Sequence, residues 1–510
     1  MKGSFAALFV LLGVTLTAGL AGAGDNDSGF KTSQPAMLTP LAAGASVTPI
    51  MNVGETLKSG YLMETIPDGI ALRTRGEGRV DVYLNHETSL VPFPFTPATG
   101  VGFSDFSNAM LSHLTLNQHS AGVLQGEYAI PSEANFQRFC SNFLVGPAQG
   151  FERELVFTNE EATDFVNRTG TAWPPGPGAE QAGVVVAYDV KSGAYRAIYG
   201  MGRHNHENSV AVPGYGHPVI LSGDDTFLAP SSQLYMYSAA NGQAVWNDQG
   251  QLRAFRSNDP NVNDYSDLSG SASVSGEFIE VPENVANGDQ TALENWSNDH
   301  GVFQFIRVED IAYDRNTPNV VYFADTGEPR ARAGAGSARM TRASTGGGPF
   351  PNGRIFKMVL NPLDETQVTS LSILVEGDPN GAASAGNVSF IHNPDNVETT
   401  GNSLLIQEDP GSQNQYAASN TSGTTARIWL YDLNTHALTV VAKVNQAQDA
   451  VANQGSWESS GIVDASSAFG PGAFLVSIQA HTIFVQQEQR GLLTFKREAG
   501  QLLVFRLAGA

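Results

Sequence analysis

The amino-acid sequence predicts an all-β fold, a six-bladed β-propeller with long loop insertions. Short β-type segments dominate the chain, these segments recur as a repeat, and the repeat places polar side chains at matching positions. All three observations are typical of a propeller, in which each blade is a small antiparallel sheet whose first strand lines a central channel.

Strands are predicted where β-branched and aromatic residues lie between clusters of Gly, Pro, Asn and Asp. The 54 glycines and 26 prolines supply those breaks. Clear examples are the segments 78–87, 183–200 and 426–444. Helical periodicity is rare. We expect helices only in short segments such as 159–168 and 449–454.

A repeat of about six copies, spaced at roughly 60–100 residues, organises these strands. Each copy has a first strand with an acidic or otherwise metal-competent residue, followed by an aliphatic second strand that ends in polar residues. A third strand and often a fourth come after a variable loop. The copies begin near residues 66, 138, 206, 307, 393 and 457.

The segment 305–314, FIRVEDIAYD, shows why the repeat implies a channel. Its strand-like pattern carries Arg307, Glu309 and Asp310 in the middle, and buried charge is costly unless it is paired or bound to a metal. In a propeller the matching residues of all copies point at one axis. On the first strands these residues are Asp68, Cys140, Glu207, Glu309, Asp395 and Glu458. The ends of the second strands add His86, Glu87, Glu160, Glu161, Asp224, Asp225, Asp325, Glu408, Asp409, Gln479 and His481.

Carboxylates that converge in such numbers would stay protonated or disrupt the fold if no cation joined them. A single GDD or NEE motif is most often a turn, so the prediction depends on six copies in register. Oxygen-rich clusters suit Ca²⁺, and a thiolate with imidazoles indicates a softer metal such as iron. The sequence therefore predicts a metal cluster in the central channel.

The overall charge limits the partners of the protein. The formal net charge is −22 and only 15% of the residues are charged. A surface of this kind repels nucleic acid and anionic membranes, so we expect neither as a partner. Beyond the N-terminus no segment is apolar for long enough to span a bilayer, and we expect no membrane insertion.

The N-terminal sequence predicts export and sets the domain boundaries. Residues 1–23 have the pattern of a Sec-type signal peptide with a cut near Ala23, which indicates a secreted or periplasmic protein. Residues 24–60 are predicted to form an extended segment that packs on the propeller, and 61–510 to form a single β-propeller domain. Cys140 is the only cysteine, so no intramolecular disulfide is possible. A lone cysteine is ordinarily a small buried core residue.

In order and spacing, the motifs of the chain resemble those of the PhoX-type alkaline phosphatase family of secreted bacterial β-propellers. The resemblance runs from Asp68 to the C-terminus. It is carried by PDG at Asp68, NHE at Glu87, GR-x-x-HE at Arg203 to Glu207, GDD at Asp224 and Asp225, R-x-ED at Arg307 to Asp310, PDN at Pro394 to Asn396, and E-x-SG at Glu458 to Gly461.

This resemblance implies a channel with several Ca²⁺ ions and an oxo-bridged pair of irons, one of them held by a cysteine, here Cys140. The implied reaction is hydrolysis of a phosphate monoester of a small phosphorylated substrate, by attack of a metal-activated oxo or hydroxide. Arg307 would clamp the phosphate, because its fork matches phosphate oxygens, and Glu309 would act beside it. The implied metal ligands are Cys140, Glu160, Glu161, Glu207, Glu309, Glu458, Asp224 and Asp395.

Two other functions fit the same fold. A calcium-dependent lactonase or esterase could use a channel Ca²⁺ to polarise a carbonyl, although Arg307 on the axis favours phosphate. A non-catalytic, calcium-stabilised propeller could instead bind a partner through long loops, such as the Gly- and Ser-rich insertion at 331–353. We expect a monomer, because the predicted channel is complete within one chain.

Overall fold

The computed structural model describes residues 28–87, 107–168, 177–226, 232–328, 350–411, 415–416, 423–490 and 493–509. The predicted signal peptide and most of the insertion at 331–353 lie outside these ranges. None of the described helices is long and apolar enough to cross a membrane.

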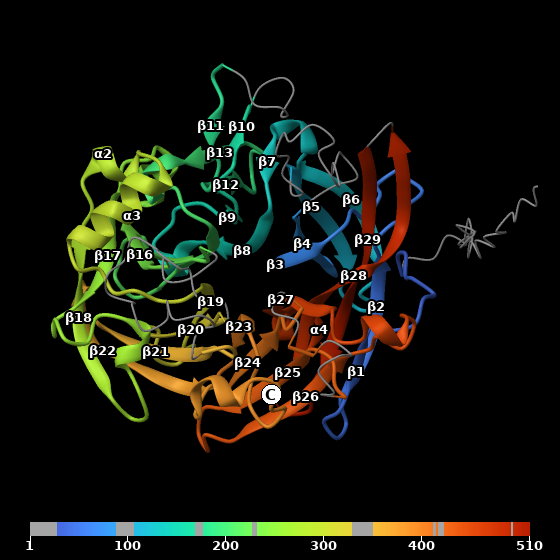
Figure 1. Ribbon diagram of the computed structural model, residues 1–510. Helices are drawn as coiled ribbons and strands as arrows, with labels where there is room; N and C mark the ends of the chain where they lie inside the picture. The colour runs from blue at the N-terminus through green and yellow to red at the C-terminus, as the bar shows by residue number, and fades with distance from the viewer. Residues whose placement is uncertain are drawn as a thin grey trace, which may run out of the picture.

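Six first strands lie around one axis, and each contacts the next so that the ring closes between the last and the first (Figure 1). They are β3 (Pro67–Gly76), β8 (Phe139–Val145), β14 (His206–Ala211), β19 (Val308–Tyr313), β23 (Pro394–Thr399) and β27 (Glu458–Asp464). Each begins one of the six predicted repeats. The all-β propeller prediction is confirmed.

Antiparallel strands continue each sheet outward from the axis. The second strands are β4 (Arg79–His86), β9 (Leu155–Glu160), β15 (Val219–Asp224), β20 (Val320–Asp325), β24 (Ser403–Glu408) and β28 (Ala473–Arg490). The third strands are β5 (Ser107–Asn117), β12 (Val185–Asp189), β16 (Leu234–Ser238), β21 (Arg354–Asn361), β25 (Arg427–Asp432) and β29 (Leu493–Arg506). Further out lie β6 (Val123–Ile130), β7 (Phe136–Gln137), β13 (Tyr195–Ile198), β17 (Gln251–Ser257), β18 (Ser273–Glu280), β22 (Asp364–Glu376) and β26 (Leu438–Val444).

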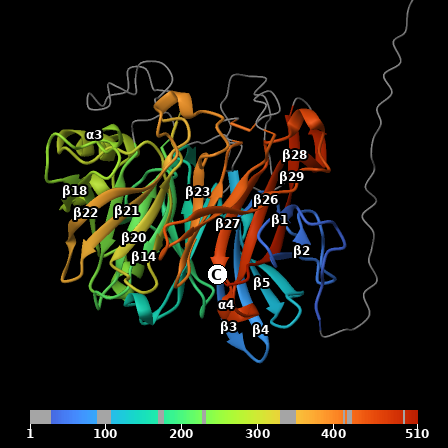
Figure 2. The same cartoon turned by 90° about the horizontal axis from the view of Figure 1, so that it is seen from below.

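The N-terminal segment completes the last two sheets. Strand β1 (Leu38–Pro40) pairs with β26, and β2 (Ser46–Asn52) pairs with β29. Backbone hydrogen bonds therefore join the N-terminal segment to strands of the fifth and sixth repeats. In the view of Figure 2 the turn between β3 and β4 lies at the lower edge, so the start of β3 faces the opposite end of the channel.

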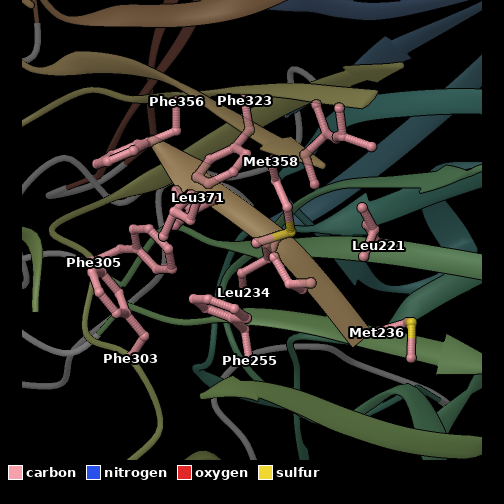
Figure 3. Close-up of a cluster of buried hydrophobic side chains, with 14 of the residues drawn as sticks. Leu221, Leu234, Met236, Phe255, Phe303, Phe305, Phe323, Phe356, Met358 and Leu371 are labelled. Atoms are coloured by element: carbon pink, nitrogen blue, oxygen red, sulfur yellow. The ribbon is translucent and has the colours of Figure 1, made fainter. Parts of the chain in front are cut away.

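The third and fourth repeats share one nine-stranded sheet, because β18 pairs with β22 at their outer sides. The largest hydrophobic cluster fills the space between them, and Figure 3 shows its aromatic centre, with Phe255, Phe303, Phe305, Phe323 and Phe356 in contact. Aromatic burial on this scale is a major stabilising contribution. It holds two of the six first strands in a fixed relative position.

The helices differ from the sequence prediction. Segment 159–168 contains the end of β9 and the strand β10 (Phe165–Val166), which pairs with β11 (Glu180–Gln181), and no helix. Within 449–454 there is one 3₁₀ turn, Val451–Asn453. The α-helices in the described part of the chain are α1 (Gly242–Trp246), α2 (Glu283–Ala286), α3 (Gln290–Asp299) and α4 (Ser466–Phe469). The sequence prediction missed α3, although Asp289 is an N-cap residue whose side chain accepts a hydrogen bond from Ala292 N.

Candidate functional site

A β-bulge interrupts every first strand close to its beginning. The shifts in pairing register fall at Pro67/Ile70, Phe139/Asn142, His206/Ser209, Val308/Ile311, Pro394/Val397 and Ser460/Ile462. A bulge leaves residues unpaired and turns their side chains in a new direction, and bulges are frequent beside active sites. Here the bulges turn side chains near the start of each first strand toward the channel.

The last unpaired residue of each bulge lines a cavity inside the ring. This cavity has a volume of about 220 Å³. Its lining includes one small or polar residue from each first strand, namely Gly69, Ser141, Asn208, Asp310, Asn396 and Gly461. The residue before each of the first five is the predicted metal-competent residue of its strand. Those residues therefore form the next layer along the axis.

A recurrent hydrogen bond brings the ends of five of the six second strands to the same layer. The backbone N–H of the residue after the second strand donates to the carbonyl two residues ahead of the metal-competent residue. The pairs are Glu87 with Ile66 at 3.1 Å, Glu161 with Arg138 at 3.0 Å, Asp225 with Asn205 at 2.9 Å, Thr326 with Arg307 at 3.0 Å, and Asp409 with Asn393 at 2.9 Å. At Ile66, Arg138 and Asn393 the backbone has a positive φ of 49°, 34° and 47°, a strained conformation that is typical of functional sites.

Nine side chains consequently meet in four clusters, in each of which the potential ligand atoms lie within 4.8 Å of one another. We call these nine residues the acidic hub. The clusters are Asp68–Glu87–Cys140, Cys140–Glu161–Glu207, Glu207–Glu309–Asp395 and Asp395–Asp409–Glu458. Cys140, Glu207 and Asp395 each belong to two clusters, so the four clusters form one continuous chain of donor atoms.

The electrostatics of the hub favour cations. Burial raises the pKa of Glu207 and of Glu309 well above the usual range, and neighbouring carboxylates raise both further. Burial also raises the pKa of Glu87 to about 8 and that of the Cys140 thiol well above its usual value. Carboxylates that are this reluctant to ionise together gain most from a bound cation.

Donor atoms of the hub also lack protein partners. Among the described residues, Asp68 Oδ1, Glu207 Oε2 and Asp395 Oδ1 are buried without a hydrogen bond. Buried polar atoms are nearly always hydrogen-bonded in folded proteins, and exceptions indicate a bound water or ion or a functional role. The donor set, eight carboxylates and one thiol, therefore fits bound metal ions.

Two arginines face the hub. Arg307 donates from Nε and Nη2 to the two oxygens of Asp225, both at 2.5 Å, and its Nη2 lies 3.3 Å from Glu309 Oε1. Arg138 donates from Nη1 to Glu161 Oε1 at 3.1 Å, and its Nε lies 3.4 Å from Glu87 Oε2. Sequence reasoning singled out Arg307 and missed Arg138. The repeat contained the signal, because each arginine lies two residues ahead of a hub residue.

Glu160 and Asp224 do not join the hub, in contrast to the expectation from the resemblance. Side chains alternate between the two faces of a strand, so in NEE and GDD only the last residue faces the channel. Glu160 accepts hydrogen bonds from Gln137 N at 2.8 Å and from Arg168 Nη1 at 2.6 Å. Asp224 accepts from Thr226 Oγ1 at 2.6 Å. Both carboxylates are buried within the protein and hold neighbouring segments in place.

The other predicted ligands do meet. Cys140, Glu161, Glu207, Glu309, Asp395 and Glu458 all belong to the hub. Asp68, Glu87 and Asp409 complete it, and all three are among the residues that the repeat predicts to converge. His481 lies beside the hub, with Nε2 at 3.8 Å from Glu458 Oε2 and Nδ1 at 2.8 Å from Glu498 Oε2.

Comparison with one solved structure supports the same fold, and two further structures are similar to a smaller degree. Pseudomonas fluorescens PhoX in complex with vanadate, a transition state analogue, has a TM-score of 0.58 and 16% sequence identity, covering 94% of this chain and 98% of that chain. The NanB sialidase of Streptococcus pneumoniae has a TM-score of 0.31 at 9% identity, covering 86% of this chain and 68% of that chain. The endo-arabinase of Bacteroides thetaiotaomicron has a TM-score of 0.30 at 10% identity, covering 75% of this chain and 97% of that chain.

Sequence comparison identifies the family. No curated protein sequence matches the chain. The family model described as alkaline phosphatase PhoX matches residues 179–479. This segment contains five of the nine hub residues and Arg307. The chain therefore belongs to the PhoX alkaline phosphatase family and is a phosphoric monoester hydrolase.

Proposed function

We propose that the protein is an exported, metal-dependent phosphatase that hydrolyses phosphate monoesters at the acidic hub. The observation that carries this proposal is the convergence of nine donor side chains from all six repeats in four adjoining clusters. Alkaline phosphatases of this family are metal-dependent, and the donor chemistry of the hub agrees with that property.

The donor types suggest which metal each cluster would hold. The clusters Glu207–Glu309–Asp395 and Asp395–Asp409–Glu458 offer only carboxylate oxygens, the ligands that Ca²⁺ prefers. Cys140 is shared by the other two clusters, and a thiolate favours a softer metal such as iron. We therefore propose several calcium ions together with iron at Cys140. Bound metal ions would supply Lewis-acid catalysis and a nucleophile at moderate pH by lowering the pKa of bound water.

The protein itself would bind and orient the phosphoryl group. Arg307 is buried, and its bidentate pairing with Asp225 fixes the plane of the guanidinium. Its position beside Glu309 places a positive charge at the edge of a carboxylate cluster. A fixed guanidinium of this kind can stabilise the charge that develops on phosphoryl oxygens, without reorganisation during the reaction.

Metal analysis combined with an activity assay tests this function. We expect the purified mature protein to contain calcium and iron and to hydrolyse p-nitrophenyl phosphate, with the activity lost on chelation and restored by the metals. A lactone substrate, assayed in parallel, separates the phosphatase from the lactonase. Calcium without iron, together with lactone hydrolysis and no phosphatase activity, would contradict the proposal.

We also propose that the protein acts outside the cytoplasm as a monomer. The export proposal comes from residues 1–23, which lie outside the described part of the chain. The monomer proposal is supported by the hub, whose nine residues all come from one chain. N-terminal sequencing of the exported protein should give a start near residue 24, and sedimentation should give the mass of one chain. An uncleaved N-terminus or a dimer mass would contradict the corresponding proposal.

A further inference from the structure

Arg138 and Arg307 occupy the same position in two different repeats. Each lies two residues ahead of a hub residue, Arg138 ahead of Cys140 and Arg307 ahead of Glu309. In both, the backbone carbonyl accepts the N–H of the residue that follows the second strand. The first strand between them is β14, which carries Glu207. The two guanidinium groups therefore flank the part of the hub around Glu207, from the repeats on either side of β14.

The two arginines differ in the carboxylates that hold them. Arg307 is held in a bidentate pair by Asp225, which belongs to none of the four clusters found among the described residues, and it has one longer contact with a hub residue, Glu309, at 3.3 Å. Arg138 is held by Glu87 and Glu161, and both are hub residues. Cations in the clusters would therefore compete with Arg138 for its carboxylate partners but would leave the pair of Arg307 and Asp225 intact.

Accessibility also distinguishes the two side chains. The side chain of Arg138 is 17% exposed, whereas that of Arg307 is 5% exposed. A ligand that approaches the hub from solvent can therefore reach more of Arg138. The backbone of Arg138 has a positive φ of 34°, a strained conformation that is common at ligand-binding positions.

We propose that Arg138 is a second phosphoryl-binding residue, which exchanges its hub carboxylates for the substrate phosphate when the metal ions are bound. This inference rests on the proposed function. A guanidinium whose carboxylate partners are shared with cations requires a new anionic partner, because like charges in a buried site repel. A phosphoryl group supplies that charge and matches the guanidinium fork in geometry.

Two guanidinium groups on one phosphoryl group would also select the class of substrate. A phosphate monoester has three terminal oxygens and carries up to two negative charges, whereas a diester has two terminal oxygens and one negative charge. A monoester can therefore satisfy Arg138 and Arg307 together, and a diester satisfies them less well. Arg138 would accordingly favour monoesters over diesters at the same metal centre.

The test compares the metal-loaded proteins with and without this guanidinium. For Arg138→Gln, we expect binding of inorganic phosphate, measured by calorimetry, to weaken roughly 10- to 100-fold, the effect of one charge-assisted hydrogen-bonding group. The ratio of kcat/KM for p-nitrophenyl phosphate to that for bis-p-nitrophenyl phosphate should decrease by a similar factor. Arg138→Lys should restore part of the binding. Calcium and iron content should not change. Arg196→Gln, which removes an exposed arginine of β13, is the matched control and should behave as the wild type.

The outcomes separate the inference from the proposed function. Phosphate binding and an ester preference that are unchanged in Arg138→Gln would overturn the role of Arg138. Metal loss in proportion to the loss of phosphate binding would also overturn it, because Arg138 would then orient Glu87 and Glu161 and not the ligand. A wild-type protein that binds no phosphate and hydrolyses neither ester would instead refute the proposed function itself.

Discussion

Glu160 and Glu161 are adjacent in the chain, and the structure gives them opposite roles. Glu160 is fully buried and accepts hydrogen bonds from Arg168 and from the backbone N–H groups of Gln137, Gly183 and Val184. Glu161 faces the hub between Cys140 and Glu207. Replacing each by Gln keeps the size of the side chain and removes one negative charge, so the two variants form a matched pair.

Glu160→Gln should destabilise the fold and leave metal binding intact. Removing one partner of a buried ion pair typically costs about 3–5 kcal/mol. Arg168 keeps a second partner, Glu180 Oε1 at 2.7 Å, and the amide oxygen of Gln can still accept hydrogen bonds, so we expect the lower end, about 3 kcal/mol. Glu161→Gln should relieve repulsion in the metal-free hub and weaken calcium binding at least roughly 10-fold, as expected for groups that form or orient a metal site.

Urea unfolding in the presence of chelator and calorimetric titration with calcium measure the two effects separately. We expect Glu160→Gln to have a lower unfolding midpoint and wild-type calcium affinity, and Glu161→Gln to have an unchanged or higher midpoint and weaker calcium binding. The reverse pattern would refute the reasoning from strand alternation. Equal effects in the two variants would refute it as well, because the side chains would then share one environment.

Three further perturbations test the hub. Cys140→Ala should lose iron and phosphatase activity but keep the far-UV circular dichroism spectrum and the calcium content; full activity would contradict the role of the thiol. For the metal-free protein, the unfolding free energy should fall as pH rises from about 4.5 to about 8. Folded Glu87, whose pKa is raised from 4.5 to about 8, keeps a proton over this range that the unfolded chain has released. Urea midpoints that rise over this range would contradict this expectation. Gly223→Ala should lower the unfolding free energy by about 2–3 kcal/mol, because its Cβ would lie 2.7 Å from Glu309 O and 2.8 Å from Val308 O; an unchanged urea midpoint would show that β15 and β19 can move apart.

The six metal-competent positions could be predicted because the propeller repeats one local design. Asp68, Cys140, Glu207, Glu309 and Asp395 each fall on the second residue of a first strand, and Glu458 falls on the first residue of β27. A residue that is unremarkable in one copy becomes informative when the same type recurs at the same place in the others. The repeat as a whole therefore predicted that these side chains converge, although no single motif predicted it.

The choice between neighbouring acids could not be made from the sequence. In NEE and in GDD two adjacent carboxylates are candidates, and only the phase of the strand decides which one faces the channel. That phase depends on the bulge in the neighbouring first strand and on the hydrogen bond between the Glu161 N–H and the Arg138 carbonyl. Both features belong to the tertiary structure. The local sequence pattern therefore identifies the two adjacent carboxylates but not which of them faces the channel.

The carboxylates that turn away from the channel explain how the hub can exist before a metal binds. Glu160, Asp325 and Glu408 each accept a hydrogen bond from the backbone N–H three residues ahead of a hub residue, at 2.8 Å from Gln137, 2.9 Å from Ile306 and 2.9 Å from His392. None of these three belongs to the clusters in the described part of the chain. The segments that present Cys140, Glu309 and Asp395 are therefore fixed by hydrogen bonds that do not depend on metal ions. It follows that the repulsion among the hub carboxylates is balanced by the rest of the fold, and that bound metal ions would relieve this repulsion within a site whose geometry is already set.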